Sequence, residues 1–138
     1  GGISVPFERG LQGHSDGDVL VHAVIDAVLG GAGLGDIGTH FPSDDERYRD
    51  VVSTMLLKDA VTLAREAGWQ ATYVDATILA ELPRLSPTID RISRSLSEAL
   101  GVPPGSVNLK ATTTDGLGFV GRGEGIAAMA VATLQPTS

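Results

Sequence analysis

The feature that most constrains this chain is a largely apolar stretch over residues 15–29, in which the polar residues Asp18, His22 and Asp26 recur at every fourth position. Residues four apart lie on one face of an α-helix, because the helix has 3.6 residues per turn. The pattern therefore predicts a helix that packs into a core on most sides and carries one polar stripe. Two interpretations of the stripe stay open: it faces solvent, or it contributes to a metal site with ligands from elsewhere in the chain.

The rest of the chain alternates between helical and strand patterns and predicts one α+β domain over residues 1–138. We expect the helices to cover one face of the sheet, and we expect Gly68 and Gly101 to end the second and third helices. The Gly- and Asp-rich segment 30–50 is expected to be a long loop. The predicted helices span residues 15–29, 50–67 and 86–101, and the predicted strands span residues 3–8, 69–82, 107–114 and 126–134.

Composition limits the partners of the chain. It has 17 acidic and 10 basic residues and a net charge of −7, which argues against nucleic acid and anionic membranes as partners. It has no cysteine, so a zinc ion would need histidine and carboxylate ligands. No apolar run approaches the roughly 20 residues that span a bilayer and no signal-peptide pattern is present, so we expect a soluble intracellular protein. The sequence begins without methionine, and we expect a further segment upstream of Gly1.

Two short motifs indicate phosphate binding. His14 and Ser15 lie at the start of the first predicted helix, where backbone N–H groups and the helix dipole favour an anion. Ordinary capping by Ser15 or Asp16 would explain the serine and the aspartate without a ligand, but it gives no reason for the histidine. Residues 112–115, Thr-Thr-Thr-Asp, combine hydroxyls with a carboxylate that suits a magnesium-like ion. Threonine is also common at strand ends, so this motif has a purely structural explanation as well.

The glycine-rich segment that follows is not a dinucleotide-binding motif. Residues 116–121, GLGFVG, match the glycine spacing of such folds, but only 17 residues follow Gly121. The motif requires a following helix and strand with an acidic residue about 20 positions further on. Arg122 and Glu124, which lie among glycines, would by composition alone belong to an exposed loop.

Four segments occur together and in order: HSDGD at 14–18, the histidine and aspartate of VLVHAVIDA at 19–27, GLGDIG and then FP within 33–42, and KATTTDGLGFVGRGEGIA at 110–127. In this combination the chain resembles the 2-C-methyl-D-erythritol 2,4-cyclodiphosphate synthase family from about Gly1 to Leu134. The resemblance implies a four- or five-stranded mixed sheet and a homotrimer with active sites between subunits. It also implies a place in the non-mevalonate isoprenoid pathway, in the bacterial cytoplasm or alternatively in the plastid stroma.

The activity implied by the resemblance is that of a divalent-metal-dependent phosphorus–oxygen lyase. The 2-phosphate of 4-diphosphocytidyl-2-C-methyl-D-erythritol 2-phosphate attacks the β-phosphorus of the same molecule, giving the 2,4-cyclodiphosphate and CMP. The implied cofactors are Zn²⁺ or a similar ion and a second ion, Mg²⁺ or Mn²⁺. Catalysis should then come from folding the substrate into line and neutralising its charge.

The resemblance also assigns roles to individual residues. His22 matches a zinc ligand carried by the helix, and two further ligands, an Asp-x-His on a strand, are expected upstream of Gly1. His14 and Thr113 match catalytic positions, and Asp115 matches a ligand of the second divalent ion where the family usually has glutamate. The matching substrate-binding positions are Ser15, Asp36, Ile37, Gly38, Phe41, Pro42, Ser43, Asp44, Asp45, Ala80, Pro83, Arg84, Leu85, Ser86, Thr112, Thr114, Asp115, Phe119 and Arg122.

Further matches concern the trimer axis and two departures from the family pattern. Phe119, Arg122 and Glu124 match residues near the axis, where the family encloses a cavity for an isoprenoid phosphate. Ser43 stands where the family often has aspartate, and Arg84 where lysine is common. Two alternative functions stay open: a metal-depleted trimer that binds a nucleotide or an isoprenoid, and a nucleotide-diphosphate hydrolase in which water is the attacking group.

Overall fold

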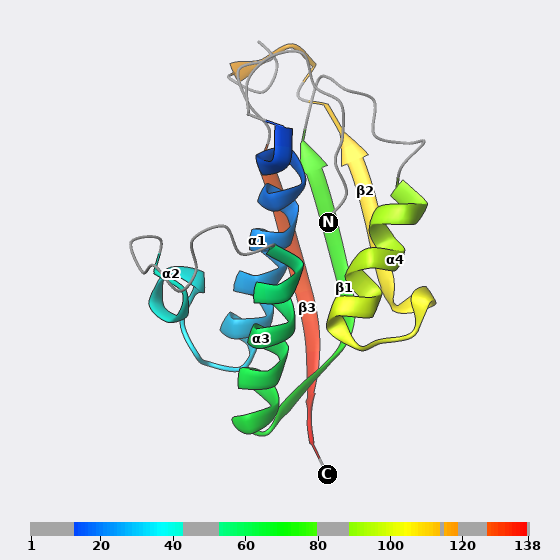
Figure 1. The fold of residues 1–138 in the computed structure, drawn as a ribbon. Coiled ribbons are helices and arrows are strands. Elements are labelled where there is room, and N and C mark those ends of the chain that lie inside the picture. The colour runs from blue at the N-terminus through cyan, green and yellow to red at the C-terminus, as the bar shows by residue number, and fades with distance from the viewer. Residues whose placement is uncertain (1–12, 43–52, 80–88, 114, 119–126, 138) are drawn as a thin grey trace.

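The computed structural model describes residues 13–42, 53–79, 89–113, 115–118 and 127–137. Four α-helices and three strands make up this part of the chain, with a short 3₁₀ turn before the second strand (Figure 1). The elements are α1 (Gly13–Gly31), α2 (Ile37–His40), α3 (Ser53–Glu66), β1 (Trp69–Leu79), α4 (Ile89–Leu100), η3 (Pro104–Ser106), β2 (Val107–Thr112) and β3 (Ala127–Pro136).

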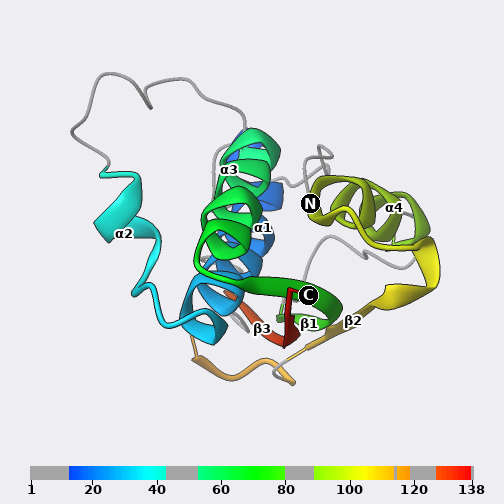
Figure 2. The same cartoon turned by 90° about the horizontal axis from the view of Figure 1, so that it is seen from below.

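The strands form a mixed sheet in the order β2-β1-β3. The central strand β1 pairs in parallel with β2, so that Val74 lies opposite Val107, and antiparallel with β3, so that Val74 also lies opposite Ala132. Figure 2 shows α1, α3 and α4 on one face of this sheet, as the sequence predicts. The described sheet has three strands rather than the four or five expected, and the further predicted strand at 3–8 lies outside the described residues.

The core lies between the three long helices and the covered face of the sheet. Each helix buries a stripe of aliphatic side chains at helical spacing, and the strands bury alternate residues. Gly68 and Gly101 follow α3 and α4 with φ of 93° and 72°, the left-handed conformation that ends a helix at little cost only for glycine. The most completely buried large side chains are Leu20, Val21, Val24, Ile25, Val28, Leu29, Leu57, Val74, Ile92, Leu96 and Leu100.

The first described helix packs on the last strand. A Cβ added at Gly31, at the end of α1, would lie 2.6 Å from Leu134 Cδ1 of β3. The backbone of α1 at Gly31 therefore lies directly against the Leu134 side chain, and glycine leaves room for that side chain.

The other face of the sheet is not covered by any described helix. It exposes three large apolar side chains, Tyr73, Met129 and Val131, of which Val131 is 71% exposed. On the same face, the carboxylate of Asp75 accepts hydrogen bonds from Lys110 Nζ at 2.8 Å and Asn108 Nδ2 at 3.0 Å. These bonds, chiefly that from Lys110, hold the pKa of Asp75 below its ordinary value.

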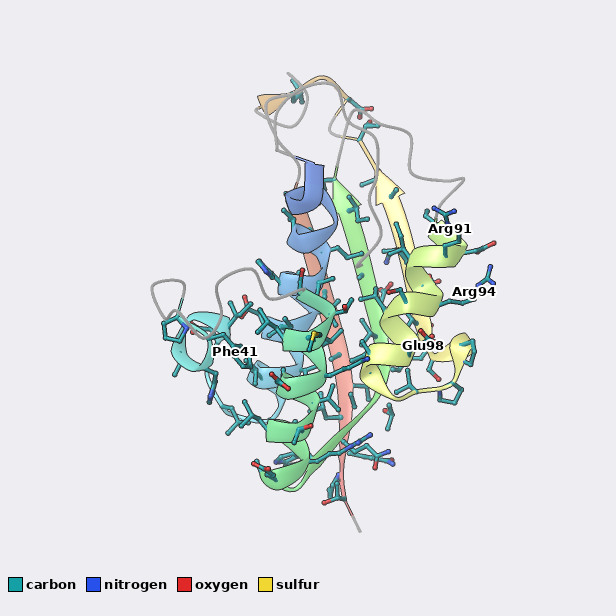
Figure 3. The ribbon with its side chains drawn as sticks, viewed as in Figure 1. Phe41, Arg91, Arg94 and Glu98 are labelled. Carbon is teal, nitrogen blue, oxygen red and sulfur yellow. The ribbon has the colours of Figure 1, made fainter. Side chains whose placement is uncertain are left out.

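The outer side of α4 is polar. Arg91, Arg94 and Glu98 are exposed and project from α4 into solvent (Figure 3), whereas Ile92 and Leu96 are buried beneath them. In the described part of the chain, no helix is both long and apolar enough to cross a membrane.

Leu57 provides a test of the core. Its side chain is fully buried in α3, so we expect Leu57→Ala to lower the free energy of unfolding by about 2–5 kcal/mol through lost contacts and a residual cavity. Met55 on the same helix is 57% exposed, and Met55→Ala should cost less than about 1 kcal/mol. Urea unfolding at one fixed protein concentration measures both, and equal losses in the two variants would contradict this assignment of the core.

Candidate active site

The strand ends bring several predicted site segments to one edge of the sheet. In the sheet register Leu79, the last residue of β1, lies opposite Thr112 of β2 and Ala127 of β3. The chain therefore leaves β1 and β2, and enters β3, at this edge. Figure 1 shows the amino end of α1 at the same end of the molecule. Ligands commonly bind beyond the carboxyl ends of parallel strands and at helix amino ends, and both features coincide here.

A tight turn after β2 displays the threonine and aspartate side chains. The Asp115 N–H donates to Thr113 Oγ1 at 3.2 Å, and Thr113 Oγ1 lies 3.4 Å from Asp115 Oδ1, to which it donates. Thr112 Oγ1 lies 3.5 Å from the Thr113 carbonyl oxygen. All three side chains are exposed at the edge of the sheet. The turn therefore exposes hydroxyls and a carboxylate to solvent.

The backbone at Asp115 gives a physical reason for aspartate at this position. Its φ is +56°, and it is the one described non-glycine residue with a positive φ. Aspartate and asparagine adopt this left-handed conformation more readily than other non-glycine residues, because a short polar side chain can hydrogen-bond locally. Gly116 and Gly118 continue the turn with positive φ.

A second candidate segment surrounds the short helix α2, within the predicted loop 30–50. Asp36 is its N-cap: Oδ1 accepts from the backbone N of Thr39 at 2.9 Å and from Thr39 Oγ1 at 2.8 Å. His40 Nε2 lies 2.7 Å from the Leu34 carbonyl oxygen, to which it donates. Phe41 is buried and lies between α2 and the other helices (Figure 3). The sequence did not predict this helix, because its glycines and polar residues are typical of a loop.

Asp36 provides a test of this segment by pH. Its hydrogen bonds with Thr39 lower its pKa below the ordinary 3.8. A depressed folded pKa means that the cap's contribution is complete above about pH 3.8 and is lost as the pH falls through the folded value. We expect an NMR titration to show the Thr39 amide shifting together with the Asp36 carboxyl carbon, below pH 3.8. A midpoint above 3.8 would contradict the cap.

The polar stripe of α1 faces outward where its side chains are described. His22 and Asp26 are both exposed, and His22 makes no hydrogen bond to another described residue. Asp26 Oδ1 accepts a hydrogen bond from the backbone N of Ile37 at 2.8 Å. The bond joins α1 to the segment that carries Asp36. Sequence reasoning missed this contact, although the four-residue spacing of the stripe marked Asp26 as unusual.

The metal ligands remain a prediction. An exposed imidazole without an internal hydrogen-bond partner suits a zinc ligand, so His22 fits that role. Within the described ranges, however, no three His, Asp or Glu side chains gather closely enough to hold an ion. The described residues therefore supply one imidazole to such a site.

The other predicted site residues divide into two groups. His14 and Ser15 lie in the first turn of α1, at the edge already described, but their side chains are not among those described. The following predicted residues lie outside the described part of the chain: Ser43, Asp44, Asp45, Ala80, Pro83, Arg84, Leu85, Ser86, Thr114, Phe119, Arg122 and Glu124.

Comparison with known proteins identifies the family. Residues 1–135, nearly the whole chain, match the YgbB family. The chain belongs to this family. The resemblance seen in the sequence is thereby confirmed, because the YgbB relatives include 2-C-methyl-D-erythritol 2,4-cyclodiphosphate synthases. The one from Halorhodospira halophila is 52% identical over 135 residues, which cover 98% of this chain and 83% of that protein.

Other YgbB relatives are longer proteins. The bifunctional enzyme IspD/IspF of Desulforudis audaxviator is 57% identical over 98% of this chain, which spans 34% of that protein. The bifunctional IspDF structure from Campylobacter jejuni superposes on 99% of this chain with a TM-score of 0.90 at 38% identity, and the chain spans 37% of it. The CDP complex of IspF from Plasmodium falciparum has a TM-score of 0.77 at 30% identity, covering 93% of this chain and 76% of that one. The α+β fold is that of these YgbB structures.

Proposed function

We propose that this chain is a 2-C-methyl-D-erythritol 2,4-cyclodiphosphate synthase, a phosphorus–oxygen lyase of isoprenoid biosynthesis. The observation that carries the proposal is 52% identity to an enzyme of that name over 98% of the chain. The CDP complex of the related Plasmodium falciparum structure supports a cytidine diphosphate as substrate. The exposed Thr113 and Asp115 turn and the amino end of α1, which lie at the same end of the molecule, support a phosphate-binding site there.

The proposed reaction joins two groups of one substrate. An oxygen of the 2-phosphate forms a bond to the β-phosphorus, and the bond from that phosphorus to the bridging oxygen breaks. The bridging oxygen leaves with the α-phosphate as CMP, so atoms and charge balance without water. Because nucleophile and electrophile belong to one molecule, the main task of the protein is to hold both in line.

The chain's own residues divide this task. The amino end of α1, with His14 and Ser15, holds the 2-phosphate through backbone N–H groups and polar side chains. The hydroxyls of Thr112 and Thr113 donate to the diphosphate, and donation by Thr113 strengthens as charge develops on the β-phosphoryl oxygens. The segments 36–38 and 41–45 enclose the methylerythritol part, and residues 80–86 hold the cytosine.

Two divalent ions complete the proposal. His22 would hold Zn²⁺ or a similar ion together with the Asp-x-His expected upstream, and Asp115 would hold Mg²⁺ or Mn²⁺. When bound, such ions neutralise phosphate charge and polarise phosphoryl oxygens. The shorter reach of Asp115, compared with glutamate, suits an ion that keeps several water ligands.

The assembly is also part of the proposal. We expect a homotrimer, and the exposed apolar side chains of Met129 and Val131 on the uncovered face of the sheet support close packing between subunits. Phe119, Arg122 and Glu124 would lie near the axis, where an isoprenoid phosphate could bind. The bacterial relatives support a bacterial cytoplasmic location. Light scattering on the purified protein tests the trimer directly.

The decisive experiment is product analysis with 4-diphosphocytidyl-2-C-methyl-D-erythritol 2-phosphate. The reaction is run with Mg²⁺ and Zn²⁺ present and is monitored by phosphorus NMR. We expect CMP and the cyclic diphosphate to form in equal amounts. A linear 2,4-bisphosphate product that incorporates ¹⁸O from labelled water into its 4-phosphate would indicate the hydrolase instead. Binding of CDP without any turnover, in protein that lacks zinc, would indicate the metal-depleted binding trimer.

A further inference from the structure

The helix α2 is too short to be stable by itself. It has four residues, Ile37–His40, whereas isolated helices shorter than about 12 residues are marginal in water. Its shape must therefore come from contacts around it. This matters because the proposed substrate segment 36–38 forms its amino end.

Two carboxylates satisfy the N–H groups at that amino end. The first N–H groups of any helix have no acceptor within the helix. Asp36 Oδ1 accepts from the backbone N of Thr39 at 2.9 Å. Asp26 Oδ1 accepts from the backbone N of Ile37 at 2.8 Å. Because the Ile37 and Thr39 N–H groups already donate to carboxylates of the protein, they are not free to bind an anion.

One of the two carboxylates bonds within the α2 segment, and the other bonds to it from a different helix. Asp36 belongs to the same segment as its partners, and the His40 bond to the Leu34 carbonyl oxygen is local as well. These contacts shape the segment without placing it on the rest of the protein. Asp26 lies on α1, eleven residues before Ile37, so its bond joins two elements.

Asp26 also lies on the His22 side of α1. The two residues are four apart in one helix and both are exposed, so their side chains share a face. The bond from Asp26 therefore places the amino end of α2 against the face of α1 that carries His22. A substrate held by segment 36–38 is thereby placed relative to that face.

We propose that Asp26 is a positioning residue that places the substrate segment 36–38 relative to His22 through its hydrogen bond to the Ile37 N–H. The inference rests on the proposed function for its effect on substrate. The contact holds segment 36–38 equally in the ground and transition states, so its loss weakens substrate binding more than it slows the chemical step.

The test compares Asp26→Ala with Asp26→Asn in the full-length protein. Alanine removes the acceptor, and we expect KM to rise about 10-fold with kcat within about 3-fold of wild type and zinc content unchanged. Asparagine keeps a carbonyl oxygen at the same place, so its KM should return to within about 2-fold of wild type. Asp59→Ala removes an exposed carboxylate from α3 and serves as the matched charge control, with KM unchanged.

Amide hydrogen exchange at Ile37 provides a readout that does not depend on activity. We expect the Ile37 amide to lose protection in Asp26→Ala and to keep it in Asp26→Asn. Unchanged protection in the alanine variant, or a fall in kcat at constant KM, would overturn the positioning role. If the wild-type protein forms no cyclic product, the proposed function fails, and the exchange result still decides whether Asp26 holds α2.

Discussion

Replacing His22 by alanine is expected to remove bound zinc and to lower turnover by more than about 100-fold. Loss of a residue that merely orients a metal ligand costs about 10–100-fold, so loss of a ligand itself should cost more. The fold should persist, because the exposed His22 side chain makes no hydrogen bond to another described residue. We expect the free energy of unfolding of zinc-free protein to change by less than about 0.5 kcal/mol.

Zinc per chain, measured by plasma mass spectrometry, and CMP release together check this prediction. His40→Ala is the matched control, because His40 donates to the Leu34 carbonyl oxygen and should leave zinc content unchanged. Full zinc content and full turnover in His22→Ala would remove His22 from the metal site. Zinc loss in both variants would point to a general disturbance of this region.

Replacing Thr113 by valine is expected to lower kcat by about 100–1,000-fold, the usual loss for one donor that stabilises transition-state charge. Valine keeps the branched shape of the side chain but has no hydroxyl to donate to the diphosphate. It also removes the acceptor for the Asp115 N–H, which now lies 3.2 Å from Thr113 Oγ1. Both changes affect the turn at residues 113–115, which we propose binds the diphosphate.

Two further variants separate these effects from a general loss of structure. Thr113→Ser retains the hydroxyl and should keep kcat within about 10-fold of wild type. Thr72→Val removes a hydroxyl that donates to the Thr133 carbonyl oxygen on the sheet, and it should leave kcat unchanged. Single-turnover measurements of CMP release distinguish the chemical step from product release. A normal rate in Thr113→Val would show that this hydroxyl has no part in catalysis.

The helices and strands with strong periodic patterns were predicted well from the sequence. The apolar spacing around His22 predicted a helix over 15–29, and α1 extends two residues further at each end. Gly68 and Gly101 were correctly expected to end α3 and α4, because glycine alone adopts a positive φ without strain. In contrast, α2 was missed, since its stability comes from Asp26, Asp36 and burial of Phe41, and not from its own composition.

The candidate site was predicted less completely. Sequence motifs selected Thr113 and Asp115 as neighbours, but the left-handed φ of Asp115 depends on the turn as folded. The bond between Asp26 and Ile37 could not be inferred from spacing, because it depends on how the loop after α1 returns to the helix. The zinc ligands beyond His22 and the trimer remain predictions, since the described residues bring no further ligand to His22 and the structure holds a single chain.

The contact between Gly31 and Leu134 has a consequence for how this protein is made. Its earliest described helix can finish packing only on its last strand, and the central strand β1 also needs β3 as a neighbour. During translation the part of the apolar side of α1 that packs on β3 therefore stays uncovered until β3 leaves the ribosome. A folding order of this kind is slow and exposes apolar surface to other nascent chains. Nascent chains on ribosomes that are stalled before Leu134 should bind chaperones and should not reach the compact folded state.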